Sequence, residues 1–250
     1  MFRISWKPVC HKSKKNLANV RGRIAESENR VGRPPGSVRL IGVTKYVDLA
    51  ATRELAESGC LDLAESRPQQ LWTKAESLVD LPIRWHLIGH LQRNKAKKTL
   101  EYASVLHSID SERLLKQIVK DAAELVPIPS RDTTNLPKAA IDLLIEVNAT
   151  SDRSKTGISL EGGRNLIRHA LELPSDLPVK VTGLMGMSSL NAPKDQIRRE
   201  FELIRTTRDT WEKEFGIPLP ELSMGMSDDF EIAIEHGATM VRIGSKLFET

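Results

Sequence analysis

The sequence predicts an α/β protein that folds as a single (β/α)8 barrel with an additional helix at its amino end. Short apolar runs alternate with helical segments along most of the chain, which is typical of a parallel sheet covered by helices. About eight such strand–helix units can be distinguished, the number that closes into a barrel. The length of 250 residues and the hydrophobic content of 40% suit one barrel with a full core. Nothing in the sequence requires a second domain.

The predicted elements follow one another in chain order. Residues 1–37 should form a leader and a helix over 17–31 that closes the bottom or side of the barrel, and residues 38–250 should form the barrel itself. Strands are predicted at 38–45, 61–65, 83–89, 105–109, 141–147, 179–185, 221–224 and 239–243. Helices are predicted at 48–58, 68–78, 94–102, 111–125, 160–173, 194–215 and 228–236.

Local signals support individual elements. Gly59 and Gly237 follow two of the predicted helices, at the position where glycine commonly ends a helix. The segment 194–215 carries an apolar stripe at helical spacing, which indicates packing against the core rather than a ligand surface. The segment 126–138 holds three prolines among Ser, Asp, Thr and Asn, so we expect an excursion over the surface there.

Charge and cysteine content argue against several classes of protein. The net charge of +4 is mild, and its basic segments, 11–23 and 93–98, lack the interleaved aromatic residues that stack on bases, so no nucleic-acid partner is expected. The first residues form no apolar stretch of the length that a signal peptide or a membrane helix needs. Cys10 and Cys60 suggest no disulfide framework. We therefore expect a soluble protein of the reducing cytoplasm without a membrane partner.

Lys45 is the first candidate for a functional residue. It stands just past the strand-forming run 38–43, at the carboxyl end of the first predicted strand, and side chains at the carboxyl ends of barrel strands point into the mouth of the barrel. A buried lysine ammonium there loses its proton readily and can condense with an aldehyde. The position alone also fits a lysine that extends along the strand end and keeps its charge in water.

The loops after the seventh and eighth strands are the second candidate. Ser223 and Ser227 offer hydroxyl groups, and the N–H groups of Gly244 and Ser245 stand at a predicted helix start, where they could hold a dianion. Such a phosphate site is common after strands seven and eight of a barrel.

An ordinary helix start is an equally good interpretation of the seventh loop. Ser227 followed by Asp228 and Asp229 would be an N-cap with acidic residues in the first turn. Since those carboxylates would repel a phosphate unless they face solvent, we expect the phosphate closer to Gly244 and Ser245.

Several segments together resemble the pyridoxal phosphate homeostasis protein family. The resemblance runs from about residue 38 to 248, and its two long segments are highly specific. The matching segments are Val43-Thr44-Lys45, Glu65-Ser66-Arg67, residues 84–95, Gly183-Leu184-Met185, residues 223–229 (SMGMSDD) and residues 241–244. Members look like the amino-terminal barrel domain of alanine racemase (fold type III), standing alone and binding pyridoxal 5′-phosphate (PLP), the cofactor form of vitamin B6.

The resemblance implies a role for each matching residue. Lys45 would form the internal aldimine (a Schiff base) with the cofactor aldehyde, and Ser223 or Ser227, with the backbone of Gly244 and Ser245, would hold the phosphate. Arg242 would face the pyridine nitrogen. Because a guanidinium only donates, that nitrogen would stay unprotonated, and the ring would be a weak electron sink that supports carbanion chemistry poorly.

Ser66, His86 and Met185 complete the set of expected cofactor-binding residues. Ser66 is a departure from the family, in which an asparagine usually stands there, so the contact at this position is expected to change. His86 and His90 are four residues apart but lie on a predicted strand that ends at Gly89, with no third ligand nearby in sequence, so no metal is expected.

The expected function is PLP homeostasis by storage, shielding or delivery, with little or no turnover and no catalytic residues. The partners would be PLP and PLP-dependent apoenzymes. The alternative is a PLP-dependent amino-acid racemase, which would need a second base, ordinarily a tyrosine from an additional domain. The chain offers Tyr46 and Tyr102, and alternation along a strand would turn Tyr46 away from the cofactor. A barrel enzyme that acts on phosphate esters without PLP is the third hypothesis.

Overall fold

The computed structural model describes residues 10–124, 140–150, 156–174 and 177–249. Eight parallel strands close into a barrel in chain order, and β8 pairs with β1. The strands are β1 Arg39–Val43, β2 Asp62–Glu65, β3 Arg84–Leu87, β4 Ala103–Ile109, β5 Ile141–Glu146, β6 Val179–Met185, β7 Glu221–Ser223 and β8 Met240–Ile243. The predicted (β/α)8 barrel is therefore confirmed. The predicted excursion at 126–138 lies outside the described residues.

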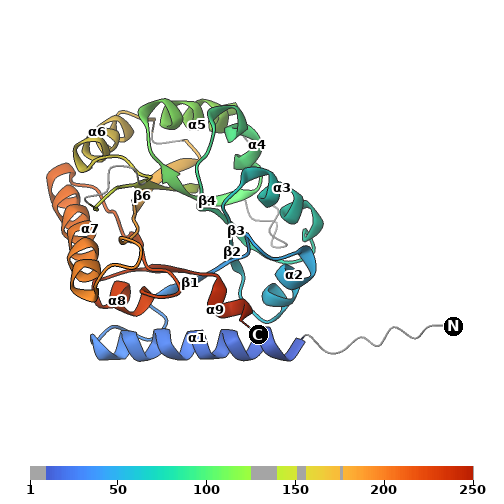
Figure 1. Ribbon diagram of the computed structural model, residues 1–250. Helices are drawn as coiled ribbons and strands as arrows, with labels where there is room; N and C mark the ends of the chain where they lie inside the picture. The colour runs from blue at the N-terminus through green and yellow to red at the C-terminus, as the bar shows by residue number, and fades with distance from the viewer. Residues whose placement is uncertain (1–9, 125–139, 151–155, 175–176, 250) are drawn as a thin grey trace.

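Helices surround the barrel as an outer ring (Figure 1). They are α2 Leu49–Glu57, α3 Pro68–Ser77, α4 Ala96–Leu100, α5 Glu112–Glu124, α6 Leu160–Leu171, α7 Lys194–Phe215, α8 Phe230–Glu235 and α9 Ser245–Phe248, with a 3₁₀ turn η1 at Arg93–Lys95. Strand β6 and helix α7 have the predicted bounds. The predicted helix 94–102 is shorter, because its first turn is the 3₁₀ turn.

Helix α1, Cys10–Arg30, lies across the outside of the barrel against α8 and α9 (Figure 1). Arg23 forms an ion pair with Glu231 of α8, and the Asn16 amide donates to the carbonyl of Glu249 at the end of α9. The predicted extra helix is confirmed, and it covers the side of the barrel. Within the described part of the chain, no helix combines the length and apolarity needed to cross a bilayer.

The core has two parts. The larger part lies between the strands and the helices, where residues such as Leu63, Phe201 and Ile204 are fully buried. The smaller part fills the inside of the barrel and contains Ile41, Val43, Ala64, Val105, Leu144, Met185 and Met240. Because these described residues pack the interior, we expect a ligand site at the ends of the barrel, as is usual in this architecture.

Candidate functional site

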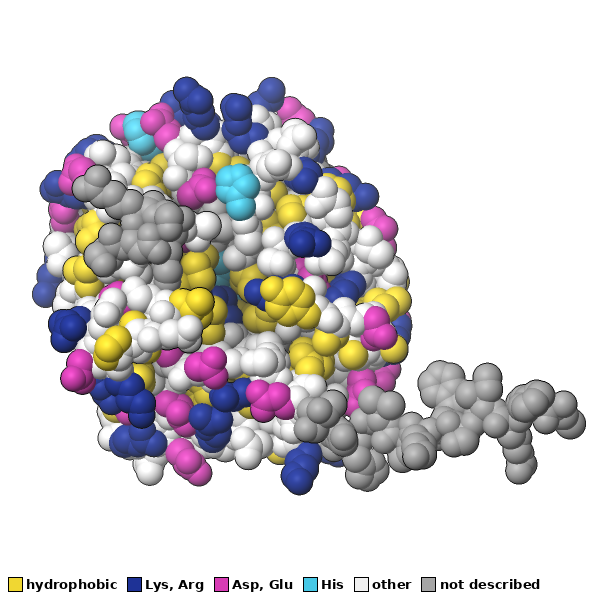
Figure 2. All heavy atoms as spheres, in the orientation of Figure 1, with side chains coloured by type: hydrophobic (Ala, Val, Ile, Leu, Met, Phe, Trp, Pro, Cys, Tyr) yellow, Lys and Arg dark blue, Asp and Glu magenta, His cyan; other side chains and the backbone are white. Residues whose placement is uncertain are grey.

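A cavity of about 610 Å³ opens at the carboxyl ends of the strands. Its walls come from strands β1, β6 and β8, from the loops after β1, β2, β3, β6, β7 and β8, and from α9. The residues that line it are Val43, Lys45, Tyr46, Val47, Ser66, Ile88, Met185, Met187, Leu190, Met226, Ser227, Asp228, Arg242, Gly244, Ser245 and Phe248. Hydrophobic side chains gather near the centre of the face shown in Figure 2. Seven predicted site residues are therefore together: Lys45, Ser66, Met185, Ser227, Arg242, Gly244 and Ser245.

Lys45 lies in a tight turn rather than on a strand. Strand β1 ends at Val43, and the N–H of Val47 donates to the carbonyl of Thr44 at 3.1 Å, so Lys45 and Tyr46 are the two middle residues of the turn. The Nζ atom of Lys45 is 4.8 Å from the centre of the Tyr46 ring. The prediction that strand alternation turns Tyr46 away is wrong, because the turn brings both side chains to the same cavity.

Arg242 forms the cationic base of the cavity. Its side chain is buried, and it donates to the carbonyl and hydroxyl oxygens of Ser223, both at 2.7 Å, and to the carbonyl of Gly186 at 3.1 Å. Burial lowers the pKa of Arg242 to about 10, against the opposing effect of Asp229 and Glu146. The guanidinium is therefore held in one orientation and remains protonated at neutral pH.

The two aspartates of the seventh loop do not face the cavity together. Asp229 occupies the N-cap position of α8, and its carboxylate accepts hydrogen bonds from the backbone of Met226 and the hydroxyl of Ser188. The side chain of Asp228 is 96% exposed and lies 3.5 Å from Lys246. The alternative interpretation, in which Ser227 is the N-cap, is wrong. Ser227 instead lines the cavity, and its hydroxyl has no protein partner among the described residues.

The eighth loop contributes backbone rather than side-chain groups. Helix α9 begins at Ser245, whose N–H lies in the first turn and so has no acceptor within the helix. Gly244 and Ser245 line the cavity beside Val43, next to the turn that carries Lys45. Ser227, Gly244 and Ser245 thus provide a polar wall on the side of the cavity formed by the last strands.

Ser66 lines the cavity, and its loop packs closely against Gly89 of the next loop. A Cβ atom at position 89 would lie 2.1 Å from the carbonyl oxygen of Ser66, so the loops after β2 and β3 can approach each other only with Gly89 between them. Ile88, just before this glycine, supplies part of the apolar wall.

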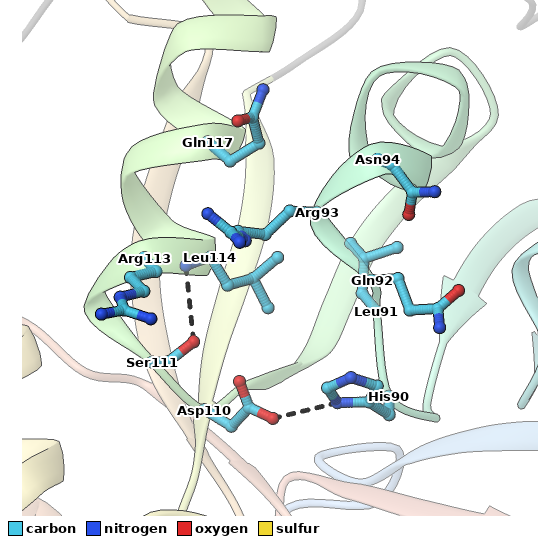
Figure 3. Close-up of a pocket in the computed structure, with 10 residues that line it drawn as sticks. All are labelled: His90, Leu91, Gln92, Arg93, Asn94, Asp110, Ser111, Arg113, Leu114 and Gln117. Atoms are coloured by element: carbon cyan, nitrogen blue, oxygen red, sulfur yellow. Dashed lines mark hydrogen bonds and ion pairs between the residues drawn. The ribbon is translucent and has the colours of Figure 1, made fainter.

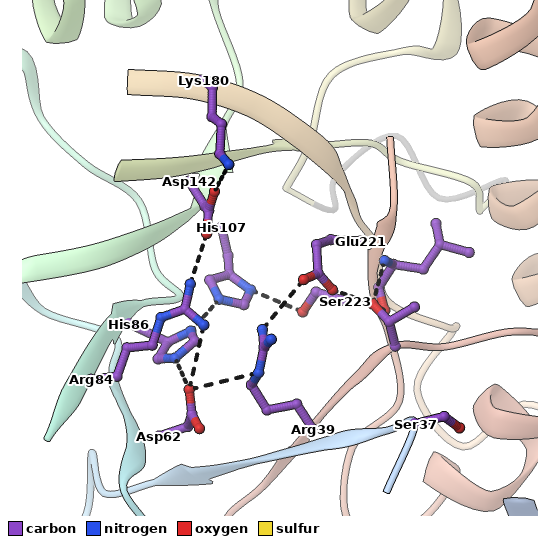
Figure 4. A network of polar contacts seen from close by, with 12 residues as sticks. Ser37, Arg39, Asp62, Arg84, His86, His107, Asp142, Lys180, Glu221 and Ser223 are labelled. Carbon is purple, nitrogen blue, oxygen red and sulfur yellow. Dashed lines mark hydrogen bonds and ion pairs between the residues drawn. The ribbon is translucent and has the colours of Figure 1, made fainter. Parts of the chain in front are cut away.

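His86 and Ser223 are buried inside the barrel and do not line the cavity. Figure 4 shows them in one polar network with Asp62 and His107. The hydroxyl of Ser223 also accepts from Arg242. His86 lies between Asp62 and His107, 2.9 Å from each, and His107 lies 2.9 Å from the hydroxyl of Ser223. Burial lowers the pKa of His86, although Asp62 opposes this, and lowers the pKa of His107 well below its usual value. His86, His107 and Ser223 therefore support Arg242 from the interior of the barrel rather than from the cavity.

A second depression, of about 630 Å³, lies between the loops after β3 and β4 and the start of α5 (Figure 3). His90 lies 3.1 Å from Asp110 there, and Arg93 extends from η1 toward α5. His90 is therefore separated from His86. Among the described residues, no group of three or more His, Cys, Asp or Glu side chains is arranged to hold a metal ion.

Comparison with known proteins identifies the family. No family profile matches the chain. A curated protein of Aquifex aeolicus, named pyridoxal phosphate homeostasis protein, is 38% identical over 93% of this chain and 95% of its own length. The chain belongs to the pyridoxal phosphate homeostasis protein family. Members from Pseudomonas aeruginosa and Escherichia coli are each 32% identical, over 93% of this chain and 93% and 94% of their lengths.

Solved structures agree with this membership. PipY of Synechococcus elongatus, solved with PLP bound, is 31% identical with a TM-score of 0.79, and the match covers 94% of this chain and 99% of PipY. A protein of Bifidobacterium adolescentis has a TM-score of 0.85 at 29% identity, over 99% and 98% of the two chains. Alanine racemase of Clostridium difficile, at 13% identity and a TM-score of 0.70, shares the fold over 95% of this chain and 59% of its own.

The sequence did not reveal every residue of the site. The apolar wall residues Met187, Leu190, Met226 and Phe248 line the cavity but follow no pattern that distinguishes them from other loop residues. Lys74, on α3, was also not predicted, although its Nζ atom contacts the turn that carries Lys45. No sequence signal pairs a helical lysine with a loop 30 residues earlier.

Proposed function

We propose that this protein binds PLP covalently through Lys45 and serves PLP homeostasis, by storing, shielding or delivering the cofactor with little or no turnover. The observation that carries the proposal is the convergence of Lys45, Arg242, Ser227 and Ser245 on one cavity, in a chain whose relative PipY was solved with PLP bound. The proposed location is the cytoplasm, and the proposed recipients are PLP-dependent apoenzymes.

The residues of the cavity fit the chemical groups of PLP. When bound, the cofactor supplies an aldehyde that reacts with a primary amine, and Lys45 is the amine in the cavity wall. Val43, Ile88 and Met185 offer an apolar surface for an aromatic ring. Ser227 and the backbone N–H of Ser245 suit a phosphate.

Arg242 supports binding rather than catalysis. Its guanidinium has five N–H groups, and the protein provides three acceptors for them, which leaves donors for a ligand. A donor that stays protonated at neutral pH, placed against the pyridine nitrogen, keeps that nitrogen an acceptor. The ring then withdraws electrons weakly, which favours retention of the cofactor over its use in carbanion chemistry.

The experiment is an absorption spectrum of the purified protein loaded with PLP, recorded before and after borohydride reduction. We expect a visible band that reduction removes, and mass spectrometry should then find the reduced adduct on the peptide that contains Lys45. Lys45→Ala should lose the band and keep the fold. Lys116→Ala, which changes a lysine whose side chain is 70% exposed on α5, is the matched control and should keep the band. An adduct on another lysine in the Lys45→Ala variant would overturn the assignment.

The racemase alternative is retained because Tyr46 lines the same cavity as Lys45. A two-base racemase needs its second base on the face of the cofactor opposite the lysine, whereas Tyr46 is the chain neighbour of Lys45 and is 88% exposed. The hydroxyl of Tyr102 donates to Glu76 on the outer helices, and Tyr102 does not line the cavity. Racemisation of alanine above the rate of free PLP, abolished by Tyr46→Phe, would establish the enzyme. Equal rates with protein and free PLP would support the homeostasis function.

A further inference from the structure

Lys74 is a second lysine next to the turn formed by residues 44–47, which we call the Lys45 turn. It contacts this turn from α3 and not from the cavity. It lies on α3 and is 8% exposed. Its Nζ atom is 2.8 Å from the carbonyl oxygen of Thr44, 3.0 Å from that of Val47 and 2.6 Å from Oε1 of Glu65. A lysine ammonium has three donors, and these contacts use all three.

The two carbonyls held by Lys74 are the ends of the turn that presents Lys45. Thr44 is its first residue and Val47 its last, and the carbonyl of Thr44 also accepts from the N–H of Val47 at 3.1 Å. One ammonium therefore ties together both ends of the turn, with Lys45 and Tyr46 between them. The backbone on either side of Lys45 can shift only if these hydrogen bonds break.

Glu65 holds Lys74 in place. It is the last residue of β2 and is fully buried, and its Oε1 atom accepts from Lys74 and, at 2.6 Å, from the hydroxyl of Thr44. Its other oxygen has no partner among the described residues. A buried ion pair with an unsatisfied oxygen gains little stability over a well-packed apolar pair, because removing both charges from water is costly. Stability alone therefore does not explain the pair, whereas the geometry of the turn does.

We propose that Lys74, held by Glu65, is the positioning residue of the PLP site, and that it fixes the Lys45 turn in the conformation that presents the Lys45 amine to the cavity. This inference rests on the proposed function, in which Lys45 attaches the cofactor. Lys74 does not compete for the aldehyde, because its amine is enclosed by three acceptors and it does not line the cavity. A turn fixed before the ligand arrives lowers the cost of ordering the amine when it binds.

The test compares Lys74→Met with the double variant Lys74→Met, Glu65→Gln. The single variant leaves a buried carboxylate without its cation and can unfold, whereas the double variant removes both charges and keeps the volumes similar. Two quantities are measured on each folded variant: the affinity for PLP by absorption titration, and the hydrogen-exchange rate of the Val47 amide. The second quantity reports on the turn without any cofactor. The double variant Lys97→Met, Glu124→Gln, which removes an exposed ion pair, is the matched control.

We expect the double variant at positions 65 and 74 to fold, to bind PLP about tenfold more weakly and to exchange the Val47 amide about tenfold faster, as befits the loss of hydrogen bonds to a charged group. The control pair should change neither quantity. A folded double variant with wild-type affinity and wild-type exchange would overturn the inference. If the wild-type protein failed to bind PLP, the proposed function would fall, and the exchange rate would still decide whether Lys74 holds the turn.

Discussion

The Nδ1 atom of His107, on β4, lies 2.9 Å from the hydroxyl oxygen of Ser223, on β7. These strands are not neighbours in the barrel, so the contact crosses its interior. The contact belongs to a chain that runs from Arg242 through Ser223, His107 and His86 to Asp62. Because burial lowers the pKa of both histidines, both are neutral at pH 7.5. The Asp62 carboxylate can only accept, so His86 Nε2 donates to it, and neutral His86 then accepts from His107 Nε2 through its Nδ1. Neutral His107 accepts in turn from the hydroxyl of Ser223.

The neutral histidines predict that stability falls in mild acid. Burial lowers the pKa of both His86 and His107 in the folded state. Below about pH 6.5, the unfolded chain therefore takes up protons that the folded chain excludes, and the free energy of unfolding decreases by up to about 1.4 kcal/mol per histidine for each pH unit. Urea unfolding at pH 7.5 and 5.5 measures this loss.

A His107→Gln variant should lose less stability between these two pH values than the wild type. His169→Gln, which changes a histidine on the outer helix α6, serves as the control and should retain the wild-type loss. An identical loss in the His107→Gln variant would show that this histidine is protonated in both states or in neither.

The close approach of Gly89 to Ser66 predicts that Gly89→Ala is destabilising. The new methyl group would lie 2.1 Å from the carbonyl oxygen of Ser66, so the loops after β2 and β3 would have to separate. We expect the free energy of unfolding to fall by about 1–3 kcal/mol. PLP should also bind more weakly, since Ser66 lines the cavity. Gly22→Ala, on α1 with no atom within 4 Å of the new methyl, should instead be neutral or stabilising by up to about 1 kcal/mol. A neutral Gly89→Ala would contradict the close packing of the two loops.

Cys60 is predicted to be unreactive in the folded protein. Burial raises the pKa of its thiol to about 12, so the thiolate fraction at pH 8 is about one part in ten thousand. Iodoacetamide at pH 8 should leave the peptide containing Cys60 unmodified in the native protein and modify it in urea, as read by mass spectrometry. Rapid labelling without denaturant would mean that the segment between α2 and β2 opens readily.

The fold and most of the cavity residues could be predicted from the sequence, because a (β/α)8 barrel brings the residues that follow its strands together at one end of the barrel. Lys45, Ser66, Ser227 and Gly244 all stand just after strands, and all line the cavity. His86 stands within β3 and points into the barrel.

The misplaced features depend on contacts between distant residues. The predicted first strand runs to residue 45, past the strand-forming run 38–43, whereas β1 ends at Val43 and Lys74 and Glu65 bond to the segment that follows it. The N-cap of α8 falls on Asp229 rather than Ser227, and the Asp229 carboxylate accepts from the N–H of Met226 and from the hydroxyl of Ser188, which lies in the loop after β6. Periodicity within one segment cannot report either interaction.

The pairing of β1 with β8 has a consequence for biosynthesis. The lysine turn emerges from the ribosome about 200 residues before the loop containing Gly244 and Ser245, and the two meet only when the last strand closes the barrel. Before that closure, a nascent chain exposes the Lys45 amine without the polar wall formed by Ser227, Gly244 and Ser245. In the proposed site, capture of the vitamin therefore has to await pairing of β8 with β1, and translation products truncated before β8 should leave the aldehyde free.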